Sequence, residues 1–125
     1  VNNLAEFAFD GDPLSAASDG KIVGKIATVG GDQVLTLTLP VRTGATFSGA
    51  TEQVSGLVDT IIYRVQGSAD LGTFGNVISE VTGGDAAAIQ SGLPGLSSGW
   101  SYRSFRTAGT VSTVSKDFMR ARVTE

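Results

Sequence analysis

The stretch Gln33-Val-Leu-Thr-Leu-Thr-Leu-Pro-Val41 has the clearest secondary-structure pattern in this chain. Its three leucines alternate with two threonines, and this period of two is typical of a half-buried antiparallel strand. The leucine face is expected to lie in a hydrophobic core and the threonine face to meet water or a ligand. Pro40 cannot donate a backbone hydrogen bond, so pairing is expected to weaken at this end of the strand.

The rest of the chain also has the pattern of short strands separated by turns. Glycine is abundant, with 17 residues, and only 17% of the residues are charged, a composition that favours strands and turns over helices. We therefore predict an all-β fold, an antiparallel β-sandwich or jelly roll, with residues 1–125 forming a single domain. Further strands are expected at 21–29, around Phe47, and at 59–66, 76–81, 101–107 and 118–124, with short helical turns at 3–9 and 86–90.

Composition excludes several classes of function. The chain has no cysteine and no histidine, which rules out disulfides, thiol chemistry, Ser-His-Asp catalysis and His-ligated metal sites. The net charge of −3 and the pI near 4.8 give no support for nucleic acid as a partner. No apolar run of about 18 residues is present, so no membrane partner is expected, and the start at Val1 is what a mature or excised soluble domain would show.

Two short motifs resemble catalytic signatures but lack the residues that would make them work. Gly95-Leu-Ser-Ser-Gly99 matches the G-x-S-x-G pattern, with Ser97 in the nucleophile position, but no histidine exists to act as its base. Ser18-Asp-Gly-Lys21 has S-x-x-K spacing without the partner motifs of the enzymes that use it. Both are expected to be loops or turns.

The carboxylates are the remaining acid–base candidates. A glycosidase needs two carboxylates facing each other across the sugar, and scattered acids are far more often solvated or capping residues. The spacing in this chain does not favour such a pair, so we expect no catalytic activity. The acids considered are Glu6, Glu52, Asp59 and Glu80.

Asp10, Asp12 and Asp19 could supply oxygen ligands to a structural Ca²⁺ ion. The segment does not fit an EF-hand, because Lys21 stands where the bidentate acid should be. An Asx turn explains the same residues without a metal. The sequence therefore requires no cofactor, and structural calcium is the alternative.

Trp100 and Tyr102 are two residues apart in an expected strand and so project from the same face, which Arg106 continues. If Phe105, on the opposite face, is the core residue, this row is exposed, and sugar rings could stack on it and hydrogen-bond to it. If the tryptophan face is buried, the row is ordinary core and Arg103 is solvated. The sequence leaves both alternatives open.

Two other strands have one apolar and one polar face. In 59–66, Tyr63 lies on the apolar face, whereas Arg64 and Gln66 lie on the other. In 118–123, Arg120 and Arg122 alternate with apolar residues, which indicates a final strand whose polar face meets water. A weak binding face for an anionic ligand is the alternative interpretation of the two arginines.

Four stretches of the chain are considered together: Asn2–Pro13, Thr60–Leu71, Gly92–Arg106 and Asp117–Val123. In combination they resemble a known group of domains. Such domains are C-terminal accessory domains of secreted bacterial proteins, including polysaccharide-degrading enzymes. Within that group the chain most resembles the β-sandwich carbohydrate-binding modules appended to soil-derived endoglucanases. The resemblance implies an extracellular domain, attached to a catalytic domain, that binds plant cell-wall β-glucan and has no catalysis of its own.

The leading hypothesis is therefore a non-catalytic carbohydrate-binding module for β-glucan, xyloglucan or cello-oligosaccharides. Trp100 and Tyr102 would stack on the sugar, with Tyr63 as a third ring. Hydrogen bonds to hydroxyl groups would come from Arg64, Gln66 and Arg106. The competing hypothesis is a structural, adhesion or surface-sorting domain of a secreted protein, whose aromatic residues only fill the core.

Overall fold

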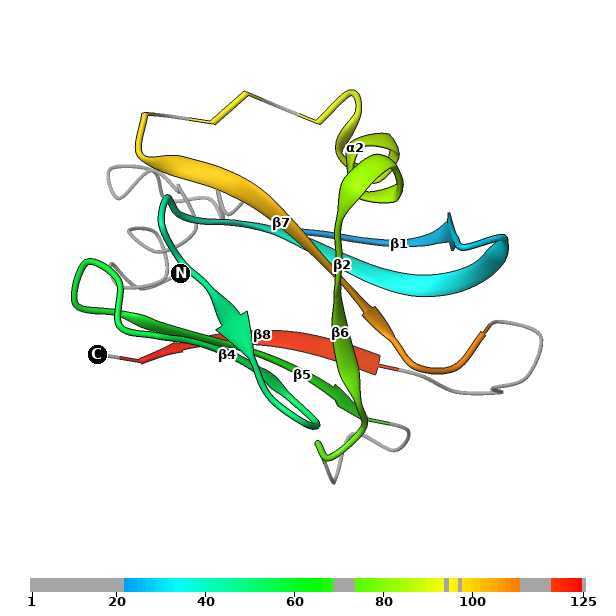
Figure 1. The fold of residues 1–125 in the computed structure, drawn as a ribbon, viewed down its shortest axis with the longest axis horizontal. Helices are drawn as coiled ribbons and strands as arrows, with labels where there is room; N and C mark the ends of the chain where they lie inside the picture. Colours follow the sequence, from blue (N-terminus) through cyan, green and yellow to red (C-terminus); the bar gives the residue numbers. More distant parts are fainter. Residues whose placement is uncertain (1–21, 69–73, 94, 97, 111–117, 125) are drawn as a thin grey trace, which may run out of the picture.

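The leucine-rich stretch forms the long strand β2, Asp32–Arg42, at the interior of one of two antiparallel sheets. The structure is a computed structural model that describes residues 22–68, 74–93, 95–96, 98–110 and 118–124. Within these ranges the secondary structure is mostly β, and the two sheets are stacked as separate layers (Figure 1). The expected all-β, antiparallel sandwich is confirmed.

The first sheet has the strand order β1-β2-β7-β6. β1 and β2 form a hairpin, and β7 pairs with the other side of β2. The chain leaves this sheet after β2 and returns to it with β6. The bounds are Val23–Val29 for β1, Trp100–Thr107 for β7 and Ile78–Val81 for β6.

The second sheet has the order β3-β4-β5-β8. Three strands that follow one another in sequence form a meander, and the last strand of the chain adds to the side of β5. Each of these strands begins within three residues of a sequence-based expectation, except β4, which the sequence did not single out. The bounds are Phe47–Ser48 for β3, Gln53–Ser55 for β4, Ile62–Ser68 for β5 and Phe118–Thr124 for β8.

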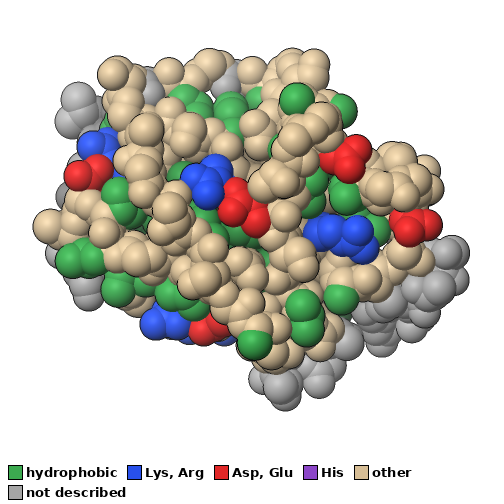
Figure 2. Space-filling model, in the orientation of Figure 1, with side chains coloured by type: hydrophobic (Ala, Val, Ile, Leu, Met, Phe, Trp, Pro, Cys, Tyr) green, Lys and Arg blue, Asp and Glu red, His purple; other side chains and the backbone are tan. Residues whose placement is uncertain are grey.

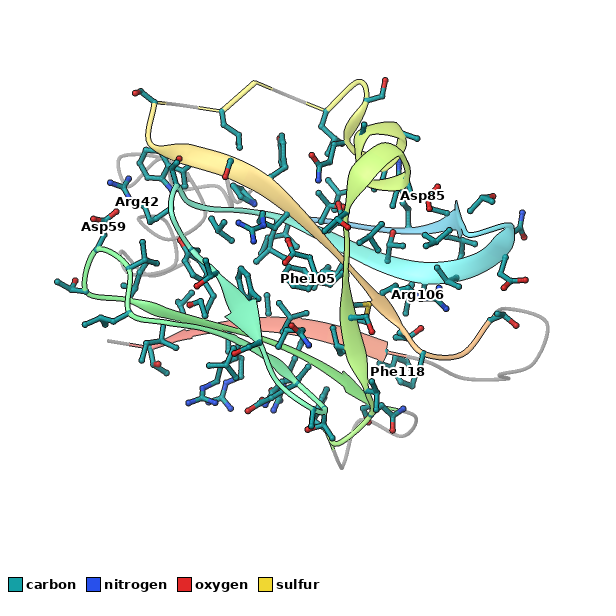
Figure 3. All side chains as sticks on the ribbon, in the orientation of Figure 1. Arg42, Asp59, Asp85, Phe105, Arg106 and Phe118 are labelled. Atoms are coloured by element: carbon teal, nitrogen blue, oxygen red, sulfur yellow. The ribbon has the colours of Figure 1, made fainter. Side chains whose placement is uncertain are left out.

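The core lies between the two sheets. Leu37 is paired directly with Phe105, so both side chains are on the inner face of the first sheet. Phe105 is completely buried there (Figure 3) and contacts Phe47 edge-to-face, with ring centroids 4.8 Å apart. The second sheet contributes Tyr63 and Val65 to the same cluster, and Ile61 joins them from the residue just before β5.

The threonine face of β2 is buried as well, which corrects the expectation that it meets water or a ligand. Thr36 donates a hydrogen bond to the backbone oxygen of Lys25 at 2.8 Å, and the hydroxyls of Thr38 and Ser104 are bonded to each other at 2.8 Å. Because each hydroxyl has a partner, burial leaves neither unsatisfied. An interior strand can therefore be covered on both faces although its sequence alternates.

The helix α2, Gly83–Gln90, covers part of this outer face (Figure 1). Lys25 on β1 donates from Nζ to the backbone oxygen of Ile89 at 2.9 Å, and the Gln90 amide donates to the Ser104 hydroxyl at 3.0 Å. Ile89 is the buried residue of the helix. The single helical turn expected here is thus a full helix, because packing on the sheet stabilises a segment too short to be helical alone. The helical turn expected at 3–9 lies outside the described residues.

Strand β6 connects the two sheets along one edge of the sandwich. Its first residue, Ile78, donates its backbone N–H to Thr51 and accepts a hydrogen bond from the Gln53 side chain. Beside it, Arg103 and Glu80 form an ion pair on the inner face, where Arg103 also donates to the backbone oxygen of Ala45 at 2.8 Å. Figure 2 shows several places where basic and acidic side chains lie next to each other on the viewed face.

No helix among the described residues is long and apolar enough to span a membrane.

We expect Glu80→Gln to destabilise the fold by roughly 1–3 kcal/mol, because the guanidinium of Arg103 would keep its charge in a mostly buried place without a counterion. Urea denaturation followed by fluorescence measures this change. Ser79→Ala, on the exposed outer face of the same strand, is the control and should stay within about 0.5 kcal/mol of the wild type. Equal stabilities of the two variants would contradict a stabilising role for the ion pair.

Candidate functional site

Trp100 and Tyr102 lie on the outer face of the first sheet. The register pairs Trp100 with Arg42 and Tyr102 with Pro40, two positions that alternate with the core-facing residues of β2. Phe105, on the other face of β7, is the buried core residue. Of the two alternatives that the sequence left open, the structure therefore has the one in which the two rings point away from the leucine core, and both are partly exposed.

Arg42 joins Trp100 to an acidic residue from the other sheet. Its guanidinium carbon is 4.2 Å from the centroid of the Trp100 ring, a cation–π contact. Its Nε donates to Oδ2 of Asp59 at 2.8 Å, and Figure 3 shows Arg42 and Asp59 close together at one end of the sandwich. We call these three residues the Trp100–Arg42–Asp59 cluster. It presents an aromatic ring, a cation and a half-exposed carboxylate within a small area.

Gly99 provides the backbone conformation that starts β7 beside Arg42. It has φ +99°, a conformation that residues with a side chain rarely adopt, and its backbone oxygen accepts a hydrogen bond from the N–H of Thr43 at 2.9 Å. A Cβ atom at this position would lie 3.4 Å from Nη1 of Arg42. The glycine before the tryptophan thus lets the backbone turn into β7 beside the arginine.

Asp59 is held in place by a strained turn. Val58 and Ile61 exchange two backbone hydrogen bonds of 2.9 Å, so Asp59 and Thr60 form a two-residue hairpin loop. Both have positive φ, 47° and 70°, which this loop type requires and which Asn-Gly usually supplies. A β-branched threonine in this conformation is strained. The strain is located beside the candidate site, where such backbone outliers tend to cluster.

We expect Thr60→Gly to raise the free energy of unfolding by roughly 0.5–1 kcal/mol, because relief of the left-handed strain exceeds the entropy that glycine adds to the unfolded chain. Denaturant titration measures the difference.

The matched control is Thr43→Gly, an exposed threonine without positive φ. There only the entropic effect remains, so this variant should lose stability by about 0.5–1 kcal/mol. A loss of similar size in both variants would show that Thr60 is not strained.

Tyr63 cannot be the third stacking ring, because its side chain is fully buried in the core. Its hydroxyl oxygen instead accepts a hydrogen bond from the backbone N–H of Arg42 at 2.9 Å and so fixes the end of β2. Burial raises the pKa of the Tyr63 hydroxyl to about 12, partly offset by this hydrogen bond. Tyr63 therefore remains a neutral phenol and supports the site from within the core.

This pKa predicts alkaline destabilisation. The folded protein keeps the Tyr63 proton to a higher pH than the unfolded chain, so unfolding releases a proton above pH 10. The free energy of unfolding should fall by roughly 1 kcal/mol per pH unit between pH 10 and 12. Urea titrations across this range measure it. Tyr63→Phe should be less stable at pH 8 and lack this component of the slope, whereas an unchanged slope would assign it to other groups.

The structure separates the remaining predicted ligand-binding residues. Arg64 and Gln66 lie on the outer face of the second sheet, on the far side of the core from Trp100. Arg106 is on the same face as Trp100, but the buried Ser104 lies between them in β7. The Arg106 guanidinium donates to the backbone oxygens of Thr107 and Ala108. The six predicted residues therefore do not form one site.

Sequence reasoning missed Arg42 as a site residue and considered Asp59 only as a general acid or base. Arg42 lies two residues after Pro40, at the end of the clearest strand, and nothing near it in the sequence indicates an aromatic partner. The cross-strand register and the strained turn bring the cluster together. The one available signal was the Asp-Thr pair between two apolar segments, which is a turn signal and not a ligand signal.

The other chemical candidates are either paired or outside the described ranges. Three of the acids considered for catalysis each form an ion pair with a different arginine: Glu52 with Arg64, Asp59 with Arg42 and Glu80 with Arg103. Among the described residues, no three acidic side chains are grouped as a metal site would require. Glu6, Ser97, the S-x-x-K turn and the calcium candidates Asp10, Asp12 and Asp19 lie outside the described residues.

A comparison of the chain with protein-family models, with curated proteins and with solved structures finds no match.

Proposed function

We propose that this chain is a non-catalytic carbohydrate-binding module that holds an attached glycoside hydrolase close to plant β-glucan outside the cell. The observation that carries the proposal is the Trp100–Arg42–Asp59 cluster, with Tyr102 beside it on the same face of β7. Tethering of this kind raises the local concentration of substrate at the enzyme without any new catalytic group.

The chemistry of the cluster suits a neutral sugar. A pyranose ring has apolar C–H faces that pack on an indole and a rim of hydroxyls that donate and accept hydrogen bonds. Arg42 contributes donors, Asp59 contributes acceptors, and their charges cancel. A neutral, amphipathic ligand therefore matches the cluster better than an anion does.

The number and placement of the rings favour a soluble chain over a crystalline surface. The sequence has one tryptophan and two tyrosines, and Tyr63 is buried. Trp100 and Tyr102 are about 7 Å apart along the strand, which is too short for a flat array but sufficient for neighbouring sugars of one chain. Mixed-linkage β-glucan, xyloglucan and cello-oligosaccharides are the ligands we propose.

We expect Trp100→Ala to weaken binding to β-glucan about tenfold, because it removes most of the apolar stacking surface. Affinity gel electrophoresis with β-glucan, xyloglucan or hydroxyethyl cellulose in the gel measures the retardation, and the variant has the same charge as the wild type. Ile26→Ala, which removes a half-exposed apolar side chain on β1, is the matched control and should be retarded like the wild type.

Trp100 is the only tryptophan in the chain, so its fluorescence reports directly on this site. Addition of cello-oligosaccharides should shift or quench it. If a folded Trp100→Ala variant is retarded as strongly as the wild type, the proposed site is wrong. No retardation of the wild type by any of these polysaccharides would favour the structural or adhesion class.

A further inference from the structure

The outer face of the second sheet carries three arginines from two neighbouring strands. Arg64 on β5 is paired directly with Arg122 on β8, and Gln66 is paired with Arg120. Cross-strand partners are about 5 Å apart and project from the same face, while Arg120 and Arg122 are about 7 Å apart along β8. We call Arg64, Arg120 and Arg122 the arginine face. Figure 3 shows nitrogen-bearing side chains that project from the lower sheet away from the core.

Most of this face is held in place by a continuous set of hydrogen bonds. Arg64 donates from Nη1 to Glu52 at 2.9 Å, and the Gln66 amide donates to the other oxygen of Glu52. Arg120 then donates from Nε to the side-chain oxygen Oε1 of Gln66 at 2.7 Å. The guanidinium carbon of Arg120 is 3.5 Å from the centroid of the Phe74 ring. Two guanidinium groups are thus pre-oriented, which lowers the entropic cost of binding a ligand.

Charge on this face is unbalanced in a chain that is acidic overall. Among the described residues of the face, three arginines are accompanied by the single carboxylate of Glu52, whereas the net charge of the chain is −3. Arg122 is exposed and makes no hydrogen bond or ion pair with the residues that the structure describes. Like charges directly opposite each other on a sheet are destabilising. Stability alone does not explain an arginine at this position.

We propose that the arginine face is a second binding site that takes a polyuronate, a polysaccharide whose sugars carry carboxylates. Guanidinium groups bind carboxylates in a bidentate geometry, and a sheet presents them at regular intervals along an extended polymer. Arg120 and Arg122 carry charges that no carboxylate among the described residues neutralises, and Arg64 and Arg120 supply oriented donors.

Glu52 and Gln66 favour an acidic sugar over a nucleic acid. A uronate offers hydroxyl donors as well as a carboxylate, so an acceptor and an amide between the arginines have partners on the ligand. A phosphate chain offers dense negative charge, which Glu52 repels and which three arginines on an acidic protein neutralise only in part. This site lies on the opposite sheet from Trp100 and does not rest on the proposed β-glucan function.

The test is affinity gel electrophoresis with polygalacturonate, using its fully methyl-esterified form as the uncharged polymer. The wild type should be retarded by the acid form and not by the ester. Arg122→Gln should weaken the affinity at least about threefold. The double variant that combines Arg120→Gln with Arg122→Gln should weaken it at least about tenfold. Mobilities are referred to a polymer-free gel, because the variants differ in charge. Lys25→Gln removes the same charge from β1 of the other sheet and should bind like the wild type.

A thermal melt separates a binding role from a structural one. Arg122→Gln should unfold at the same temperature as the wild type or higher, because the substitution relieves repulsion from Arg64 while it weakens binding. Trp100→Ala should keep its affinity for polygalacturonate. Four results would each overturn the proposal. Two concern the ligand: equal binding of the methyl ester, or tighter binding of single-stranded DNA than of polygalacturonate. Two concern the variants: an equal loss of binding in Lys25→Gln and Arg122→Gln, or a loss of binding in Trp100→Ala.

Discussion

The pairing of β2 with β7 is the interaction on which the rest of this structure depends. The register that places Leu37 opposite Phe105 fills the core between the sheets, and the same register places Arg42 opposite Trp100 on the outer face. A shift of one residue would exchange these two faces and bury Trp100 in place of Phe105. Core packing and the candidate site are therefore specified by one set of backbone hydrogen bonds.

The residues around the Arg42–Trp100 end of this pairing hold it in place. The Tyr63 hydroxyl accepts the backbone N–H of Arg42, and Gly99 allows the chain to enter β7 close to the arginine. The strained turn at Asp59 and Thr60 then brings a carboxylate from the second sheet to the same place. Backbone strain at this turn is compensated by the sandwich, and its effect is to hold an aromatic ring, a cation and an anion together.

The two outer faces of the sandwich have different chemistry. On the first sheet, buried threonines and the helix α2 leave a compact neutral cluster at one end. On the second sheet, the arginine face, with Arg122 exposed and the other two arginines half-buried, is only partly neutralised by Glu52. A neutral glucan suits the first face and a carboxylated polymer suits the second. The proposed module could thus contact two components of one cell wall through opposite surfaces.

By itself the sequence determined the all-β class, the strands with strict alternation, and the absence of histidine and cysteine chemistry, because these follow from local pattern and composition. It also placed Trp100 and Tyr102 on a common face. Only the tertiary structure decided which face of β7 is the core, because alternation is symmetric and burial depends on the partner sheet. Cross-strand register and a turn likewise decide three further features, because they join residues far apart in the chain. These features are the burial of Tyr63, the ion pair of Arg42 with Asp59, and the pairing of Arg64 with Arg122.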